Sequence, residues 1–268
     1  MIELTNKSPR IFFKYRDWNN EFHKRILTDN EVYFATANQF NDPFDASLPF
    51  TYDASELTDE NIFKKLIETR LHDFPQENEE DRIKYAKERA QTVDFRSQEY
   101  WDKMYPFTRD HLHKHFGIYS LARRRDNLLM WAHYANSHRG FSVGIKKSSL
   151  KSLRFTQLLK VEYSNQFPQR PMFISDDEQT KYLLKITTTK SKHWSYEREY
   201  RLINMIFPNT PFRLKDDFVS EICLGLAMNE ESKEEIKTLW KEKFPQAKLF
   251  QTSIDTKKFS LKFIEIKK

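Results

Sequence analysis

The chain has 268 residues, a formal net charge of +6 and 15% aromatic residues, enough length and apolar area for one large folded domain. A single cysteine, Cys223, excludes intrachain disulfides and cysteine-rich zinc sites, and four glycines cannot build a P-loop or a dinucleotide-binding loop. The first residues lack an apolar leader, and no segment approaches the roughly 18 apolar residues of a membrane span, so we expect a cytoplasmic protein without membrane contact.

The first third of the chain alternates short strands with polar segments. In chain order, the pattern predicts a strand over 10–18, a helix over 19–30, a strand over 31–37 and a loop over 38–50. Asn19 or Asn20 can cap the helix, and Asn41, Asp42 and Pro43 favour turns in the loop. These elements form the start of a mixed fold.

The pattern changes to long helical periodicity with charges of both signs over about 55–116, which indicates a helical insertion or cap. The later elements are a strand over 116–122, a helix over 126–135 with Asp126 as its cap, strands over 139–145 and 158–164, helical spacing over 176–194, a strand over 219–226, a helix over 230–244 and strands over 249–255 and 259–266. This irregular alternation predicts a single α+β domain over 1–268.

The stretch WSYEREYRLI, residues 194–203, combines charges with aromatic residues. If it is a strand, Glu197, Glu199 and Arg201 project from one face. Such a face is either a solvated surface with weak ion pairs or a site in which two close carboxylates have different pKa values.

A second polar and aromatic group lies on the helix predicted over 126–135. Trp131, His133 and Tyr134 can stack and form hydrogen bonds, although a histidine in such a helix also serves simply in packing. Alternate histidines in the segment 111–115 point apart on a helix, so no metal site is expected there.

These motifs resemble the bacterial family catalogued as domain of unknown function 2971. The resemblance covers about Arg10 to Ile203, interrupted by the helical segment, and the matching residues are Tyr15 and Arg16, Tyr33 and Phe34, Asn41 to Asp45, Trp131 to Tyr134, Gly140, and Glu197 to Arg201. The family name carries no activity.

The order of motifs also resembles the ADP-ribosyltransferase superfamily, with Arg16 on a first strand, a helix, a second strand, and a late Glu197-Arg198-Glu199. The resemblance implies a split, mixed or antiparallel β-sheet core and NAD as a substrate bound without a glycine-rich loop. It implies that Glu199 stabilises an oxocarbenium-like transition state and that Glu197 orients or deprotonates the acceptor. Arg16 would bind the pyrophosphate, so Arg16 and Glu199 should face the same cleft.

The same resemblance implies further binding residues. Tyr134 or Trp131 would stack on a ring, Thr36, Tyr33 or Tyr134 could contact nicotinamide, and the remaining candidates are Tyr15 and His133 for NAD and Asn41, Asp42, Asp45 and Arg201 for the substrate or its loop.

The resulting hypothesis is an ADP-ribosyltransferase-like bacterial effector, in antiphage defence or a toxin system, that cleaves NAD and modifies a protein or nucleic acid. The helical segment would recognise the target or a regulatory partner. One alternative is a metal-dependent nuclease that uses Asp42, Asp45, Glu197 and Glu199. Another is a non-enzymatic sensor or adaptor.

Overall fold

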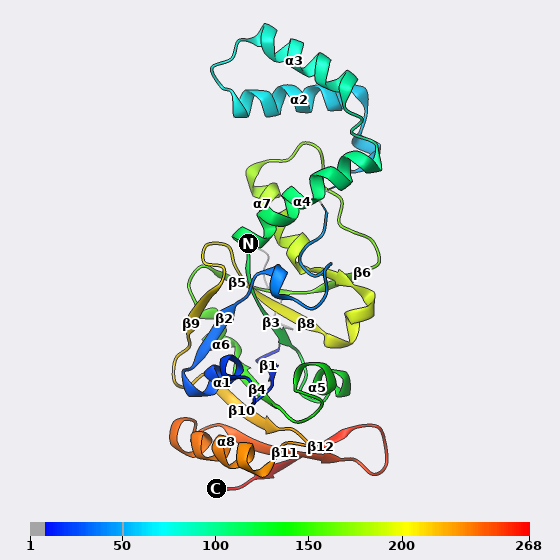
Figure 1. The fold of residues 1–268 in the computed structure, drawn as a ribbon. Coiled ribbons are helices and arrows are strands. Elements are labelled where there is room, and N and C mark those ends of the chain that lie inside the picture. Colours follow the sequence, from blue (N-terminus) through cyan, green and yellow to red (C-terminus); the bar gives the residue numbers. More distant parts are fainter. Residues whose placement is uncertain (1–8, 50) are drawn as a thin grey trace. The chain divides into compact units, whose positions relative to one another are not determined.

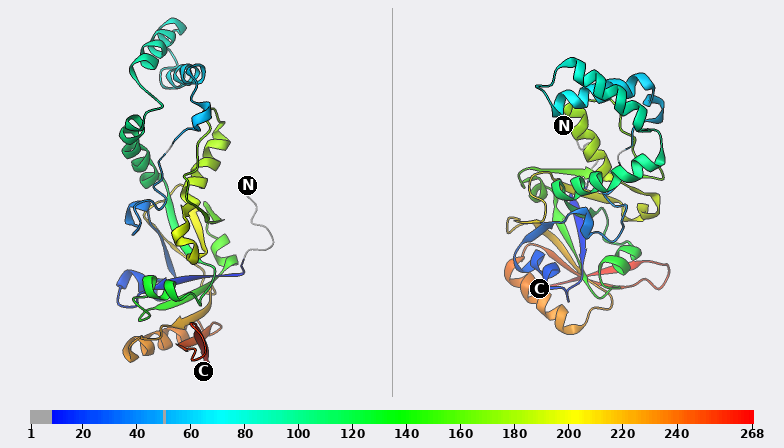
Figure 2. Two further views of the ribbon diagram at one scale, coloured as in Figure 1. Left: turned by 90° about the vertical axis from the view of Figure 1, so that its right-hand side faces the viewer. Right: turned by 45° about the horizontal axis from the view of Figure 1, so that its top comes forward.

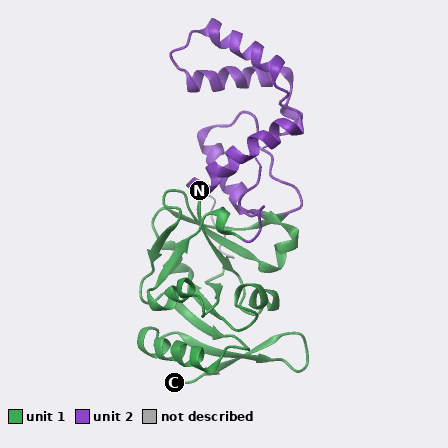
Figure 3. Cartoon of the chain, in the orientation of Figure 1, with its two compact units in different colours: residues 1–40, 115–163, 190–268 green, residues 41–114, 164–189 purple. Residues whose placement is uncertain are grey.

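The computed structural model describes residues 9–49 and 51–268 (Figures 1 and 2). The chain divides into two compact units (Figure 3). Unit 1 contains residues 1–40, 115–163 and 190–268, and unit 2 contains residues 41–114 and 164–189.

Unit 1 is built on an eight-stranded open sheet with the order β12-β11-β10-β4-β1-β3-β8-β5. Its strands are β1 (Ile11–Arg16), β3 (Gly117–Ala122), β4 (Phe141–Lys146), β5 (Thr156–Lys160), β8 (Glu199–Asn204), β10 (Val219–Leu224), β11 (Lys248–Ile254) and β12 (Leu261–Ile266). Neighbours are antiparallel except β10 and β11, which are parallel. The prediction of a mixed α and β fold with a mostly antiparallel sheet is confirmed.

Smaller strands and helices complete the described chain. β2 (Glu31–Phe34) pairs with β9 (Thr210–Arg213), and β6 (Glu162–Ser164) pairs with β7 (Thr189–Ser191). Unit 1 carries α1 (Glu21–Thr28), η1 (Ala37–Gln39), α5 (Leu128–Tyr134), α6 (Lys147–Lys151), η3 (Lys192–Glu197) and α8 (Glu230–Lys243). The other helices are η2 (Ala54–Glu56), α2 (Asp59–Asp73), α3 (Glu79–Thr92), α4 (Gln98–His115) and α7 (Asp176–Thr188).

The two faces of the large sheet have separate cores. Phe12, Tyr119 and Leu202 belong to the larger core, which also includes apolar residues of α1 and α8. Phe13 and Trp131 belong to the smaller core on the side of α5. Because side chains alternate along a strand, this division fixes which residues of β1, β3 and β8 share a face.

The strands β1 and β3 separate soon after they meet. Their register contains one pair, Phe13 with Ala122, whereas β1 pairs with β4 along its whole length. Further along β3, Ile118 forms a bridge with Ala35. Between these contacts the ammonium group of Lys14 donates a hydrogen bond of 2.6 Å to the carbonyl of Ser120. A side chain therefore occupies the position that a strand hydrogen bond would take.

Two helix starts show how local sequence sets the elements near the site. The side chain of Asn20 accepts hydrogen bonds from the backbone of Phe22 and His23 and caps α1, as one of the two predicted caps. Asp126 does not cap α5. Asn127 accepts the capping bonds, because the carboxylate of Asp126 is already bound to Arg124.

In unit 2, Ile62, Leu66, Ala86 and Met172 form a small core of their own. The carboxylate of Asp42 accepts a hydrogen bond of 3.0 Å from the backbone of Phe44 and stabilises the predicted turn. Within the described ranges, 9–49 and 51–268, helices of the length and apolar character needed to cross a bilayer do not occur.

Candidate functional site

The segment WSYEREYRLI does not form one continuous strand. Glu197 is the last residue of η3, Arg198 has a left-handed backbone with φ of 48°, and β8 begins at Glu199. Every residue of β8 is buried, so a solvated charged face is also wrong. The turn at Arg198 changes the direction of the chain between the two glutamates.

The two carboxylates nevertheless meet at one lysine. The ammonium nitrogen of Lys190 lies 2.7 Å from Oε2 of Glu197 and 3.3 Å from Oε2 of Glu199. Arg201 donates to both oxygens of Glu199, from Nε at 2.9 Å and from Nη2 at 3.1 Å. All four side chains are buried, with at most about 6% of any residue exposed. We call these four residues the ionic network.

Neutral donors and acceptors complete the ionic network. The hydroxyl of Tyr134 donates a hydrogen bond of 2.6 Å to Oε1 of Glu197. The hydroxyl of Tyr163 accepts the backbone N–H of Glu199 at 2.8 Å, and the side chain of Ser120 bonds to the Glu199 carboxylate. These contacts join β3, β6, β7, β8, α5 and η3 within unit 1.

The environment shifts the two carboxylates in opposite directions. Burial acts to raise the pKa of Glu199, but Arg201 and Lys190 outweigh it and lower this pKa to about 2. Burial raises the pKa of Glu197, and the nearby charge of Glu199 adds to the effect, with Lys190 opposing it. One carboxylate is thus held ionised, while the other is the readier proton acceptor of the pair.

Four aromatic side chains lie beside the Glu197 end of the network: His133, Tyr134, Trp194 and Tyr196. The ring centroids of His133 and Tyr196 are 6.2 Å apart, and those of Trp194 and Tyr196 are 6.0 Å apart. His133 is exposed and the other three are half-buried. We call this group the aromatic rim, and it can offer flat surfaces to a ring of a ligand.

Two of the predicted binding residues are instead part of the smaller core. Trp131 is fully buried, and its indole N–H donates to the carbonyl of Arg125 at 2.7 Å. Tyr15 packs against it edge-on at 5.2 Å and donates its hydroxyl proton to the carbonyl of Arg124. Their polar atoms are occupied, and their rings are covered.

Tyr33 and Thr36 lie at the other end of β8. Both hydroxyl groups donate to the side chain of Asn209, at 3.2 Å and 3.1 Å. The adjacent Ala35 bridges to Ile118, which pairs with Ile203, four residues beyond Glu199. At about 3.3 Å per residue, this places Tyr33 and Thr36 roughly 13 Å along the strand from Glu199.

Arg16 and Glu199 project from opposite faces of the large sheet. Phe13 of β1 pairs with Ala122 of β3, and Ala122 pairs with Glu199 of β8. Because directly paired residues of antiparallel strands project from the same side of a sheet, these three residues share one face. Arg16 is an odd number of residues from Phe13 on β1, which places it on the other face. The expectation that Arg16 and Glu199 face one cleft does not agree with this register.

The loop candidates Asn41, Asp42 and Asp45 belong to unit 2, whereas Glu197 and Glu199 belong to unit 1. Asn41 is exposed and Asp45 is buried. In the part of the chain that the structure describes, no three His, Cys, Asp or Glu side chains are arranged to hold a metal ion.

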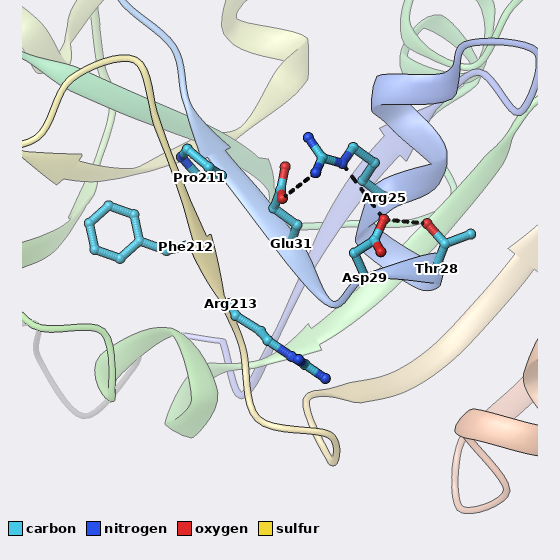
Figure 4. A pocket seen from close by; sticks show the side chains of 7 residues that line it. All are labelled: Arg25, Thr28, Asp29, Glu31, Pro211, Phe212 and Arg213. Carbon is cyan, nitrogen blue, oxygen red and sulfur yellow. Dashed lines mark hydrogen bonds and ion pairs between the residues drawn. The ribbon is translucent and has the colours of Figure 1, made fainter.

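A shallow hollow of about 370 Å³ lies in unit 1 between α1, β2 and β9 (Figure 4). Its lining residues are Arg25, Thr28, Asp29, Glu31, Pro211, Phe212 and Arg213. Arg25 forms ion pairs with Glu31 at 3.1 Å and with Asp29 at 3.6 Å. The lining contains none of the predicted site residues, and its charges are largely paired with one another.

Lys190, Tyr163 and Ser120 were not among the predicted site residues. Lys190 follows the run Ile186-Thr187-Thr188-Thr189 and was included in the predicted helical spacing, but α7 ends at Thr188. The run of β-branched threonines is the signal for this boundary, since such residues favour strands over helices.

Comparison with known proteins supports one of the two family resemblances in part. The sequence model of the family described as "Protein of unknown function (DUF2971)" matches residues 130–202. This range contains α5 from its third residue onward, the aromatic rim, Lys190 and both glutamates of the ionic network. No curated protein and no solved structure matches the chain significantly.

Proposed function

We propose that the protein cleaves the bond between ribose and nicotinamide in NAD and transfers the ADP-ribosyl group to a macromolecule. One observation carries this proposal: Glu197 and Glu199 are bridged by the single ammonium group of Lys190, and their pKa values are shifted in opposite directions. Pairs of carboxylates with such divided roles suit glycosidic bond cleavage.

Each carboxylate takes one role in this reaction. As the bond from ribose to nicotinamide breaks, nicotinamide leaves with the bonding electrons and positive charge develops on the ribose. The ionised Glu199 lowers the energy of that charge. Glu197, whose pKa is raised, accepts the proton of the attacking acceptor hydroxyl or amine as the new bond to ribose forms.

Substrate access requires a local opening, because Glu197 and Glu199 are only 4% and 3% exposed. The half-buried Tyr134 is bonded to Glu197, and in this proposal its displacement opens a route to the carboxylate. The aromatic rim would then stack on the nicotinamide or adenine ring. Arg16 has no part in this proposal, since it projects from the opposite sheet face. A role in antiphage defence or a toxin system rests on the family resemblance alone.

The test is nicotinamide release from NAD by the purified protein, with cell extract supplied as acceptor. We expect E199Q to lower the rate about 10²- to 10³-fold, the range for loss of one electrostatic group at a transition state. The matched control is E221Q, which removes a partly buried carboxylate bonded to Arg125 outside the network. Equal rates for E199Q and the wild type, with both proteins folded, would refute the proposal.

A second candidate is a non-enzymatic binding module, in which the ionic network is structural. It is favoured by the complete burial of Arg201 and its two hydrogen bonds to Glu199, which leave this carboxylate saturated. This candidate predicts no nicotinamide release by the wild-type protein and a loss of stability, not of catalysis, in E199Q.

A further inference from the structure

A second cluster of charged side chains lies on the opposite face of the sheet from Glu199. Lys14 and Arg16 project from the same face of β1, because they are two residues apart. Tyr119 of β3 shares that face, as it is an odd number of residues from Ala122, which is on the Glu199 side. His23 of α1 is held next to the end of β1, where its Nδ1 accepts the backbone N–H of Asp17 at 3.3 Å.

Short-range contacts and electrostatic effects connect these four side chains. The ammonium group of Lys14 lies 4.6 Å from the centre of the Tyr119 ring. Burial lowers the pKa of His23 to about 4, and the charges of Arg16 and Lys14 add to this effect, so all three groups lie within interaction range. Arg16 also interacts with Tyr119. We call these four residues the cationic cluster.

The polar groups of the cationic cluster are incompletely satisfied by protein atoms. Within the described part of the chain, neither Lys14 nor Arg16 forms an ion pair, although Lys14 bonds to the carbonyl of Ser120. The hydroxyl of Tyr119 is buried, with 2% of the residue exposed, and has no hydrogen-bond partner. Buried donors of this kind are costly unless a ligand or solvent satisfies them.

The carboxylates that act on Lys14 and His23 are already hydrogen-bonded or ion-paired. The carboxylate of Asp17 accepts hydrogen bonds from the backbone of Asn19 at 3.0 Å and from the side chain of Asn136 at 3.1 Å. Glu197 and Glu199 influence Lys14 from the far side of the sheet, but both are bound to Lys190. The cluster thus offers the positive charge of Arg16, which has no ion-pair partner among the described residues, whereas burial lowers the pKa values of Lys14 and His23.

We propose that Lys14, Arg16, His23 and Tyr119 form a binding site for a phosphate-class oxyanion, separate from the carboxylate pair. A guanidinium group, an ammonium group, a phenol and an imidazole N–H are all donors that match the several acceptor oxygens of such an anion. Arg16 is half-buried and not fully enclosed, which gives the anion a route from solvent. The ammonium group of Lys14 donates to the carbonyl of Ser120 where β1 and β3 separate. Glu199 acts on Lys14 electrostatically, so Lys14 is influenced by both faces of the sheet.

The proposed ligand is a free phosphate-class oxyanion, and a parallel titration distinguishes it from a phosphate group of NAD. Inorganic phosphate is titrated by calorimetry at constant ionic strength into the wild-type protein, R16Q, Y119F, E199Q and the control R213Q. Arg213 is an exposed arginine of unit 1 outside the cluster, so R213Q removes the same charge elsewhere. A parallel series with NAD tests whether NAD displaces phosphate.

We expect saturable phosphate binding by the wild type, weakened about ten-fold or more in R16Q and Y119F, not weakened in E199Q, which removes a negative charge, and unchanged in R213Q. Y119F is the decisive variant, since the Tyr119 hydroxyl has no protein partner and its removal should leave the fold intact. NAD should not displace phosphate. Absence of saturable binding, unchanged binding in Y119F, equal weakening in R213Q, or displacement of phosphate by NAD would each overturn a separate anion site.

Discussion

The hydroxyl of Tyr134 donates a hydrogen bond of 2.6 Å to the carboxylate of Glu197, joining α5 to the end of η3. This bond stabilises the ionised form of Glu197 and so opposes the rise of its pKa. Y134F should therefore raise this pKa further. If Glu197 acts as a base, the acid limb of the pH profile for nicotinamide release should move to higher pH.

The matched control for Y134F is Y196F, which removes a hydroxyl of the aromatic rim that does not bond to Glu197. Its pH profile should follow that of the wild type. A profile for Y134F that coincides with the Y196F profile would show that Glu197 does not act as the base.

Lys190 is bound to two buried carboxylates, and its removal leaves Glu197 without a counter-ion close to Glu199, which keeps its ion pair with Arg201. We expect K190M to lower the free energy of unfolding by about 3–5 kcal/mol, the usual cost of breaking a buried ion pair. The control K181M removes an exposed lysine that pairs with Asp177 on α7, and its stability should stay close to that of the wild type. Urea unfolding at neutral pH measures both, and similar values for the two variants would contradict a stabilising role for Lys190.

Glu199 should also contribute to the pH dependence of stability. Its pKa in the folded chain is about 2, below the value of about 4.3 for an unfolded glutamate. The unfolded state therefore binds a proton first as the pH falls, and the stability that Glu199 contributes above about pH 5 is lost between about pH 5 and pH 2. Unfolding free energies of wild type and E199Q should converge over this window.

The comparison with E60Q separates this effect from that of carboxylates in general, because Glu60 is an exposed residue paired with Lys64. Its unfolding curve should stay close to that of the wild type throughout. If the difference between wild type and E199Q is the same at pH 6 and near pH 2, ionisation of Glu199 does not stabilise the fold.

Local sequence signals predicted several elements near the site correctly. Asn20 caps α1, and the strand assigned to residues 116–122 closely matches β3, because capping side chains and runs of apolar residues act over a few positions. The strand assigned across Glu197 was wrong, since its alternating pattern does not reveal the left-handed backbone of Arg198. The two glutamates still meet, through a turn instead of a shared strand face.

Long-range features of the site could not be predicted in the same way. That Lys190 lies between Glu197 and Glu199 depends on how β7 and η3 are placed after α7, and no local pattern encodes this arrangement. The opposite orientation of Arg16 and Glu199 follows from the register of two antiparallel strand pairs. A shift of one residue in either pair would have reversed it.

The two tryptophans of the matched segment, Trp131 and Trp194, should respond differently to substitution. Trp131 is fully buried in the smaller core, so W131L should lower the free energy of unfolding by about 3–5 kcal/mol, close to the cost of large core truncations. Trp194 is half-buried in the aromatic rim, 5.1 Å from the ammonium group of Lys190. W194L should weaken NAD binding about ten-fold or more, since stacking of one base contributes roughly 1–3 kcal/mol, with a much smaller loss of stability. Calorimetric NAD titration and urea unfolding of both variants give the comparison, and weakened binding in folded W131L but not in W194L would exclude the aromatic rim as the stacking surface.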